Sequence, residues 1–360
     1  MKFVDFGRIV LCGCVAGVML AGCGALPLSL SKGQDDTQPP IRAAGIRSQS
    51  VLSLALAPWL RPIARIDLAS ANRRSTPSWM ARGAMAQNLL YISNGGADNV
   101  YVYSYPAGSL VGKLGQLQDP VGLCVDRTGN VWIVNSASST IVEYAHGSKK
   151  RKATLQDYGL QNLLGCAVDP LNGNLAVTEL GSPSSAGNVW IYPNAKGSPK
   201  KFRDPQMQYV YFCGYDDRGN LFVDGLNSNY GFVFAERLAG SRSLRSISLN
   251  QSVGFPGGIQ WDGTYVAIGD QFYQTQHKSA IYQVSVSGST GTVQGTTLLS
   301  GACDVLQFDI SSLGSTGSSV VAPDDCRNNA AFYNYPAGGS PTKTLSGFQY
   351  PFGAAVSLAQ

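Results

Sequence analysis

The feature that most constrains this chain is a repeated pair of short apolar segments joined by a tight turn. The clearest copy runs from Pro120 to Ser136 as Pro-Val-Gly-Leu-Cys-Val-Asp-Arg-Thr-Gly-Asn-Val-Trp-Ile-Val-Asn-Ser. Gly129 and Asn130 suit the turn because both tolerate the left-handed backbone that a hairpin connection requires. The residue that anchors the turn recurs along the chain. The anchors are Asp126, Asp169, Asp216, Asp262, Asp309 and Ser357.

The anchors follow one another at intervals of 43, 47, 46, 47 and 48 residues. A period of this size, built from strands alone, predicts a β-propeller. We therefore expect an all-β fold, a six-bladed β-propeller of four-stranded blades, over residues 86–360. The 44% of hydrophobic residues is sufficient for a large apolar core between the blades.

The two ends of the repeat region indicate how the ring closes. The first unit begins at Leu89–Asn94, which matches the second strand of the other units. Its missing innermost strand is expected to come from Phe352–Leu358. The ring would then be closed by the C-terminal strand in the N-terminal blade, which leaves no long unpaired edge.

The first residues have the pattern of a bacterial targeting segment. Lys2 and Arg8 precede an apolar run of 12 residues, Ile9–Leu20, which is too short to span a bilayer. Leu20-Ala21-Gly22-Cys23 resembles the lipobox of bacterial lipoproteins, which implies a signal peptide over residues 1–22 and lipidation of Cys23. An ordinary signal peptide, cut near Gly22, is the alternative.

Residues 23–85 are expected to form a largely disordered tether, because Ser29–Pro40 is polar and cannot bury enough apolar surface to fold. The apolar segment Val51–Leu60 could dock on the propeller or lie on a membrane. Gly24 after the cysteine resembles the outer-membrane sorting pattern. We therefore expect a lipid-anchored protein of the bacterial cell envelope, at the outer membrane, with the lipid as its membrane attachment.

The charge pattern argues against a nucleic-acid partner. The chain has 27 Lys and Arg against 22 Asp and Glu, and its dense basic run is Lys149–Lys152. Nucleic-acid binding would require a basic stripe with interleaved aromatic residues. A solvated outer strand, whose charges discourage edge pairing, explains this run.

The residues from Gly122 to Asn135 resemble the NHL repeat. Proteins with related propellers include the gluconolactonase and regucalcin group and the streptogramin lyases, and the resemblance covers Leu89–Gln360. It implies the fold, whereas such blades serve binding modules and enzymes alike. The lactonase group implies a divalent metal over the channel with a Pro-Asp-Gly motif, but here Pro256-Gly257-Gly258 lacks that Asp.

Histidine and cysteine offer little further chemistry. The lyase group implies a His near the start of an innermost strand, and neither His146 nor His277 lies there. His146 is interpreted as a turn residue, and His277 lies in the long connection Gln271–Ser279. Three cysteines precede turn anchors in innermost strands, where Cys behaves as a small buried hydrophobe. They are Cys124, Cys166 and Cys213.

One face of the ring collects polar and aromatic residues. Acids or amides begin the connections that follow the second strands, namely Asn94, Asn135, Glu179, Asp224, Asp270 and Asp324. Aromatic residues lie in the connections that enter the innermost strands, namely Tyr158, Tyr209, Tyr211, Phe255, Tyr350 and Phe352. The polar residues could simply cap the following turns. Alternatively, they form an acidic mouth with an aromatic rim, suited to a sugar, peptide or cationic ligand.

Two functional hypotheses follow. The first is a binding or scaffolding module for a small ligand or an envelope protein, without a cofactor. The second is a metal-assisted lactonase or lyase that uses Glu179, Asp224 and Asp270. Bound Ca²⁺ or Mg²⁺ would distinguish them, because hard cations require several converging oxygen ligands.

The sequence also predicts a disulfide between Cys303 and Cys326. An envelope location permits oxidation, and the two residues flank the same inner hairpin. A register that pairs Asp309 with Val320 would place them opposite each other, with Cys124, Cys166 and Cys213 as competing partners.

Overall fold

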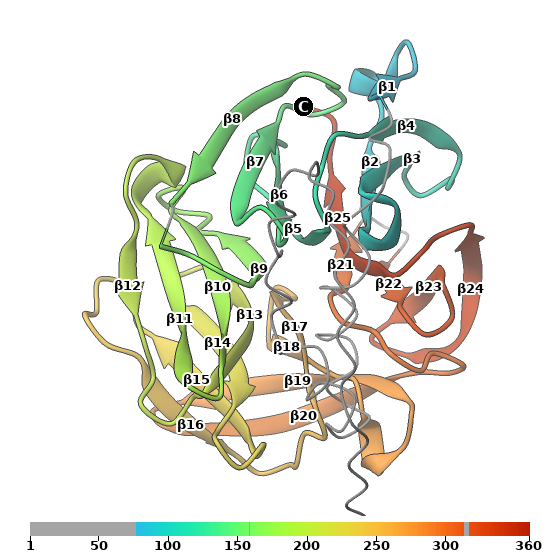
Figure 1. Cartoon of the computed structure of the whole chain (residues 1–360). Helices are drawn as coiled ribbons and strands as arrows, with labels where there is room; N and C mark the ends of the chain where they lie inside the picture. The colour runs from blue at the N-terminus through green and yellow to red at the C-terminus, as the bar shows by residue number, and fades with distance from the viewer. Residues whose placement is uncertain (1–76, 158, 313–316) are drawn as a thin grey trace, which may run out of the picture. The chain divides into compact units, whose positions relative to one another are not determined.

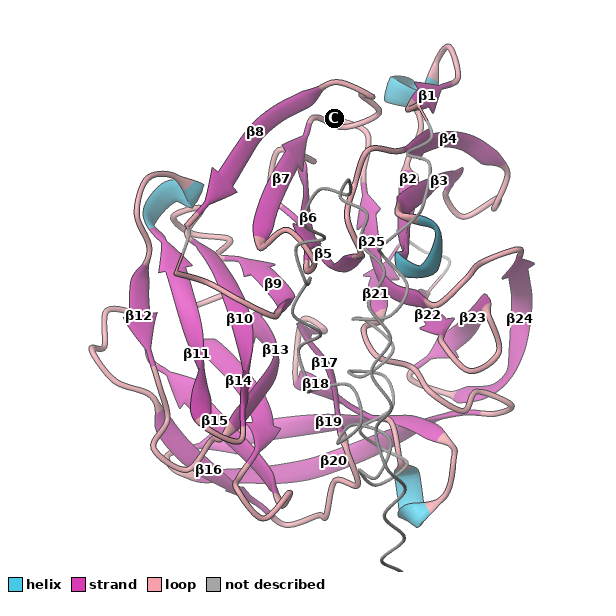
Figure 2. Ribbon diagram, viewed as in Figure 1, coloured by secondary structure: helices cyan, strands magenta, loops and turns pink. Residues whose placement is uncertain are grey.

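The computed structural model describes residues 77–157, 159–312 and 317–360. Within this part of the chain the regular structure consists of β-strands and short 3-10 turns, with no α-helix (Figure 1). Figure 2 shows how the strands dominate every part of the described fold. The turns are η3 (Ala84–Ala86), η4 (Gly95–Ala97), η5 (Pro193–Ala195) and η6 (Tyr273–Thr275). The expected all-β class is therefore confirmed, and no described helix is long and apolar enough to cross a membrane.

The strands β5 to β24 form five antiparallel meanders of four consecutive strands each, called the second to sixth sheets below, and the last three of these are joined into one 12-stranded sheet. The second sheet contains β5 (Pro120–Val125), β6 (Val131–Asn135), β7 (Thr140–Tyr144) and β8 (Arg151–Gln156). The third contains β9 (Leu163–Val168), β10 (Leu175–Ser182), β11 (Ser185–Tyr192) and β12 (Lys200–Phe202). The fourth contains β13 (Tyr209–Tyr215), β14 (Leu221–Leu226), β15 (Phe232–Arg237) and β16 (Arg245–Leu249).

The remaining two meanders complete this set. The fifth sheet contains β17 (Pro256–Trp261), β18 (Val266–Asp270), β19 (Ser279–Ser287) and β20 (Thr290–Leu299). The sixth contains β21 (Asp309–Ser312), β22 (Ser318–Asp324), β23 (Asn329–Tyr335) and β24 (Gly338–Ser346). Short parallel pairings join the outermost strands β16, β20 and β24 edge to edge, which protects these edges from other chains.

The first sheet combines the two ends of the described chain. Its strands are β1 (Trp79–Met80), β2 (Leu89–Asn94), β3 (Asn99–Ser104), β4 (Leu110–Leu114) and β25 (Pro351–Ser357). The C-terminal strand β25 pairs antiparallel with β2, and Tyr91 lies opposite Ala355. The C-terminus therefore supplies a strand that pairs with β2, where the sequence lacks a strand before Leu89.

The start of the first sheet corrects one expected boundary. Trp79–Met80, assigned to the tether that ends at residue 85, forms β1 and pairs with the outer strand β4. Ser78 Oγ accepts a hydrogen bond of 2.9 Å from the backbone N–H of Gly115. Strand structure is therefore present before residue 86, because β4 presents a backbone edge with which a short segment can pair. Residues 23–76 of the expected tether, including Cys23, lie outside the described residues.

Innermost strands of neighbouring sheets approach so closely that glycine is required between them. A Cβ atom on Gly122 in β5 would lie 2.2 Å from the carbonyl oxygen of Leu164 in β9. A Cβ atom on Gly214 in β13 would lie 2.5 Å from the carbonyl oxygen of Ile259 in β17. Both distances are well below van der Waals contact, so any side chain would force the sheets apart. The glycines of the repeat thus allow the sheets to pack together at the centre.

Aromatic side chains fill the centre at the end where the innermost strands begin. Phe212 of β13 and Phe352 of β25 belong to the fourth and first sheets, yet their ring centroids lie 6.0 Å apart. Tyr211 packs edge-on against Phe255, with 5.2 Å between centroids. All four side chains are buried. Tyr211, Phe255 and Phe352, which were expected in an aromatic rim, therefore form an aromatic plug together with Phe212, and this name is used below for these four residues.

Candidate functional site

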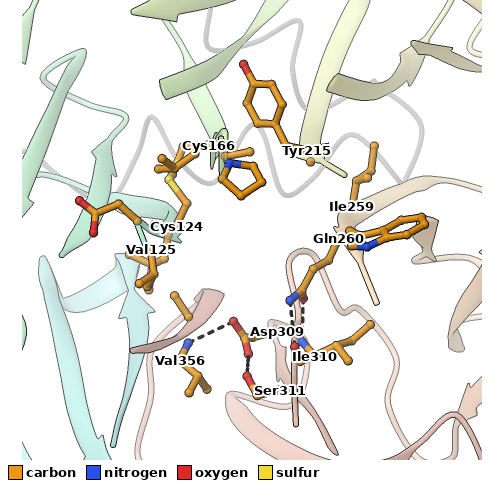
Figure 3. Close-up of a pocket in the computed structure, with 18 of the residues that line it drawn as sticks. Cys124, Val125, Cys166, Tyr215, Ile259, Gln260, Asp309, Ile310, Ser311 and Val356 are labelled. Carbon is orange, nitrogen blue, oxygen red and sulfur yellow. Dashed lines mark hydrogen bonds between the residues drawn. A yellow bond between two sulfur atoms is a disulfide. The ribbon is translucent and has the colours of Figure 1, made fainter. Parts of the chain in front are cut away.

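A cavity of about 590 Å³ lies among the innermost strands, at the end opposite the aromatic plug. Residues from all six sheets line it, since the wall includes parts of β5, β9, β13, β17, β21 and β25. Figure 3 shows labelled side chains from these strands around an open centre. The wall continues into the turns that follow the innermost strands, at Asp126 and Asp216 for example.

Two glutamine side chains join the innermost strands across the cavity wall. Gln260 donates to the carbonyl oxygen of Ile310 at 2.9 Å and accepts from its N–H at 2.7 Å. Gln307 makes the same double contact with Leu123, at 2.6 and 2.9 Å. Each side-chain amide thus replaces a backbone pairing partner between sheets. Both amides are already occupied by the protein.

Asp309 is the carboxylate that an innermost strand places in this wall. Its Oδ2 atom accepts a hydrogen bond of 3.0 Å from the N–H of Val356, and Oδ1 accepts one from the Ser311 hydroxyl (Figure 3). Burial raises the pKa of the Asp309 carboxyl to about 6, although these two hydrogen bonds act in the opposite direction. Near neutral pH the wall therefore holds a carboxylate close to its titration range.

A disulfide forms another part of the wall. Cys124 of β5 and Cys166 of β9 are bonded, with 5.7 Å between their Cα atoms (Figure 3). The expectation that both are unpaired buried hydrophobes is therefore wrong, because the close approach of the two strands brings the side chains within bonding distance. Cys213 alone of the three is free and buried, and burial raises the pKa of its thiol.

The six predicted polar residues lie at the opposite end from the cavity. Asn135, for example, pairs with Pro120, the first residue of β5, whereas the cavity surrounds the last residues of that strand. Five of the six are buried and Glu179 is partly buried. In the described part of the chain, these six side chains therefore do not line an open acidic mouth.

Most of these residues hold the segment that leads into the innermost strand of their own sheet. Asp270 accepts hydrogen bonds from the backbone N–H groups of Gly254 and Phe255, each at 3.1 Å. Asn94 Oδ1 accepts from the Gln349 N–H at 2.6 Å. The other such acceptor pairs are Asn135 with Gln118, Glu179 with Gln161, and Asp324 with Cys303. This geometry favours the capping interpretation.

Asp224 binds a backbone N–H inside the innermost strand β13, whereas the other caps bind the segment before such a strand. Its Oδ1 atom accepts from the N–H of Phe212 at 2.9 Å, while Oδ2 is buried without a hydrogen-bond partner. Burial raises the pKa of the Asp224 carboxyl well above its usual value, and the hydrogen bond from Phe212 acts against this shift. Burial likewise raises the pKa of Asp270 and Asp324. These carboxyls therefore hold backbone groups in place, although their burial costs solvation free energy.

The predicted tyrosines also lie away from the cavity. Tyr209 is buried and stacks on Tyr230, with 5.7 Å between ring centroids. Tyr350 is 42% exposed, and its backbone N–H donates to Asn328 Oδ1. Tyr158 lies outside the described residues.

The histidines have different roles from those of a catalytic pair. His146 is buried and its ring nitrogens contact Ser357 Oγ at 2.6 Å and the Gln87 carbonyl oxygen at 2.9 Å. It thus fixes the last residue of β25, and burial lowers the pKa of its imidazole. His277 is exposed and lies edge-on to Phe272, 4.9 Å between centroids. Neither ring lines the cavity.

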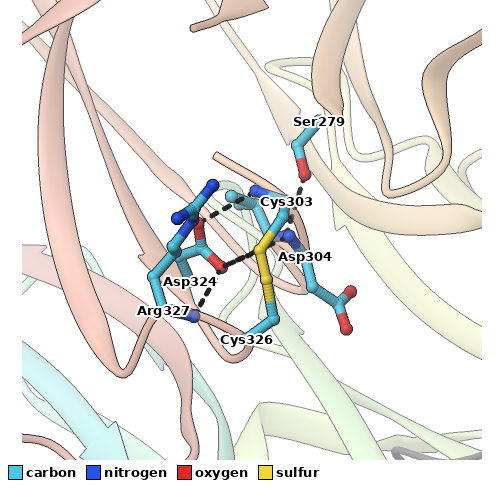
Figure 4. The surroundings of a disulfide bond; sticks show 7 residues. Ser279, Cys303, Asp304, Asp324, Cys326 and Arg327 are labelled. Atoms are coloured by element: carbon cyan, nitrogen blue, oxygen red, sulfur yellow. Dashed lines mark hydrogen bonds between the residues drawn. A yellow bond between two sulfur atoms is a disulfide. The ribbon is translucent and has the colours of Figure 1, made fainter. Parts of the chain in front are cut away.

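Cys303 and Cys326 form a disulfide, with 6.3 Å between their Cα atoms (Figure 4). Asp309 lies opposite Val321, one residue from the expected partner Val320. Asp324 accepts a hydrogen bond from the Cys303 N–H, so a cap and a disulfide hold this segment together.

The described carboxylates of the enzyme hypothesis do not fit a calcium or magnesium centre. Glu179, Asp224 and Asp270 belong to three different sheets, and each accepts hydrogen bonds from backbone groups of its own sheet. Their oxygens therefore do not lie around one point. Within the described ranges, the potential ligand atoms that converge belong to Cys303, Asp324 and Cys326, and both of these cysteines are in the disulfide. A hard cation requires several oxygens around one point.

No family model matches the chain, and no curated protein matches it. Solved structures do match over 76% of the chain. One is the crystal structure of a nidogen/laminin complex, which contains a β-propeller, with a TM-score of 0.60, 14% identity and 99% of that chain covered. The fold is β-propeller-like. A functionally unknown protein from Desulfotomaculum acetoxidans also matches, with a TM-score of 0.52, 12% identity and 100% coverage. At such identities the likeness concerns the fold alone.

Proposed function

We propose that this chain is a lipid-anchored protein of the bacterial cell envelope whose six-bladed, NHL-type propeller binds a small ligand in its central cavity. The observation that carries the binding proposal is the cavity of about 590 Å³, lined by all six innermost strands. Its volume lies within the range of small-molecule sites. A propeller that encloses such a space at one end and is plugged at the other suits a binding module.

Contacts between the first, second and sixth sheets support a closed ring. A Cβ atom on Gly353 in β25 would lie 3.0 Å from the Val121 carbonyl oxygen of β5. On the other side, Asp309 of β21 accepts the hydrogen bond from Val356 of β25. The C-terminal strand therefore contacts both neighbours. We infer that it closes the ring.

Binding is favoured over metal-assisted catalysis. The carboxylates of the enzyme hypothesis are caps, and the cavity wall contains no histidine among its described residues. The lipid anchor at Cys23, supported by the lipobox resemblance, and the outer-membrane location, supported by Gly24, complete the proposal.

A thermal-shift screen with sugars, cell-wall fragments, organic cations and divalent metals tests the binding proposal. At least one small organic compound should raise the melting temperature, because a ligand that binds only the folded state stabilises it. Val125→Phe, which fills part of the cavity, should abolish that shift. The matched control is Leu171→Phe in an exposed turn outside the wall, which should keep it. If no compound shifts the wild type, or if both variants respond like the wild type, cavity binding is wrong.

A further inference from the structure

We propose that the cavity binds an organic cation, with the Asp309 carboxylate as its counter-charge and the Trp261 ring as an aromatic contact. This inference rests on the proposed function and names the ligand class. Three observations support it. The wall is acidic, the Asp309 oxygens can accept further hydrogen bonds, and the glutamine amides of the wall are already bonded to backbone groups.

The wall of the cavity is acidic. Its carboxylate side chains outnumber its basic ones, since Arg127 is the basic residue among the described wall residues. The carboxylates are Asp126, Asp216, Asp217 and Asp309. An anionic ligand would therefore meet repulsion, whereas a cation would be attracted.

The carboxylates of the turns are largely occupied. Asp126 Oδ1 accepts from the N–H groups of Thr128 and Asn130, at 2.8 and 3.0 Å. Asp216 Oδ1 holds the equivalent turn in the fourth sheet. Asp217 is exposed, so water screens its charge. These three side chains contribute to the field of the cavity but leave Asp309 as the carboxylate placed to contact a ligand.

Asp309 has no cationic partner among the described residues. Each of its oxygens accepts one hydrogen bond, from Ser311 or from Val356, and each carboxylate oxygen can accept two. Its carboxyl is desolvated without a Lys or Arg beside it, which is why its pKa is raised. A ligand cation would supply the missing counter-charge and compensate that desolvation.

The other wall groups favour a cation over a sugar. The amides of Gln260 and Gln307, which could otherwise bind hydroxyl groups, are each paired with backbone of a neighbouring strand. Trp261 is partly buried in the wall, and Tyr215 lies in it too. Aromatic faces attract cations, most strongly when the site is partly desolvated. A wall with a carboxylate, aromatic rings and few available amides suits a compact organic cation.

Calorimetric titration of the full chain with choline, putrescine and guanidinium tests this inference, with 3,3-dimethyl-1-butanol as the neutral analogue of choline and glucose as a neutral polyol. At least one cation should bind, and choline, if it binds, should do so at least about tenfold more tightly than its neutral analogue. Asp309→Asn, which keeps the size and an acceptor for Val356, should weaken cation binding about tenfold or more. Asp217→Asn is the matched control, with an expected change under about twofold because its carboxylate is exposed.

The outcomes separate this inference from the proposed function. Binding of glucose or the neutral alcohol, with no cation bound or with no loss in Asp309→Asn, would overturn the cation inference and leave cavity binding intact. Equal losses of cation affinity in Asp309→Asn and Asp217→Asn would also overturn it, since the general negative charge of the wall, and not contact with Asp309, would then explain the binding. If neither these probes nor any compound of the thermal-shift screen binds, both proposals fail.

Discussion

Single side chains of the second strands compensate for irregular pairing in the innermost strands. The pairing of β13 with β14 shifts register between Val210 and Cys213, which removes a regular partner from the Phe212 N–H. Asp224 accepts that hydrogen bond, and Thr178 Oγ1 accepts the corresponding one from Gly165 at 2.8 Å. Buried backbone groups must be paired, so the polar side chain at this position is part of the fold.

Two substitutions of Asp224 distinguish the effect of its hydrogen bond on stability from the effect of its charge. Asp224→Ala leaves the buried Phe212 N–H without an acceptor and should lower the free energy of unfolding by about 1–3 kcal/mol. Asp224→Asn keeps an acceptor and should be at least as stable as the wild type at pH 7. Urea unfolding of the three proteins measures both effects. An Asn variant as unstable as the Ala variant would contradict the role assigned to the hydrogen bond.

The same comparison has a defined pH dependence. Burial raises the pKa of Asp224 above its value in the unfolded chain, so the stability contributed by the carboxyl is present at low pH. That contribution is lost as the pH rises through the pKa of the folded state. The advantage of Asp224→Asn over the wild type should therefore be small near pH 4 and larger at pH 7. An advantage that shrinks with rising pH would contradict this sign.

The residues of the cavity show where sequence patterns stop being informative. Capping by Asn94, Asp270 and their equivalents could be anticipated, because an acid or amide at a strand end commonly holds a turn. The role of Gln260 and Gln307 in joining the innermost strands could not be anticipated, since an isolated glutamine fits many environments. Asp309 did carry a signal: it occupies the anchor position of a weak repeat that lacks the Gly-Asn turn, so its carboxylate does not hold such a turn.

Elements were easier to predict than the contacts between them. The spacing of the anchors located the inner strands: β5 and β6 lie within the predicted hairpin Pro120 to Ser136, and β2 coincides with Leu89–Asn94. The period gives no information on how the strands of neighbouring sheets align. For that reason the Cys124–Cys166 bond between β5 and β9 was missed, whereas Cys303–Cys326, within one hairpin, was expected.

Removal of the disulfide between β5 and β9 should destabilise the fold. The bond closes a separation of 42 residues, for which the chain-entropy estimate is about 4 kcal/mol. The separation of 23 residues between Cys303 and Cys326 gives about 3 kcal/mol. Chemical unfolding of Cys124→Ala/Cys166→Ala and Cys303→Ala/Cys326→Ala measures the two contributions. An unchanged unfolding midpoint for the first pair would show that this bond does not constrain the chain.

The proposed lipid anchor concerns the molecule as a whole, because it would determine where the protein acts. Cys23→Ser should move the protein from the membrane fraction to the soluble fraction, since burial of acyl chains is the membrane attachment that the sequence offers. Fractionation of cells that express the wild type and the variant measures this. Ala21→Ser, beside the cysteine, is a control expected to remain attached. A Cys23→Ser protein that still sediments with membranes would favour Val51–Leu60 as the attachment.

We propose that closure by β25 places six innermost strands around one cavity, and deletion of Phe352–Gln360 tests this proposal most directly. The deletion removes the partner of β2, the Val356 N–H that binds Asp309, and the Ser357 contact of His146. Circular dichroism with thermal melting should show loss of the cooperative β transition, because both neighbouring sheets lose their contact. A truncated protein with the full β signal and an unchanged melting temperature would contradict a ring closed by this strand.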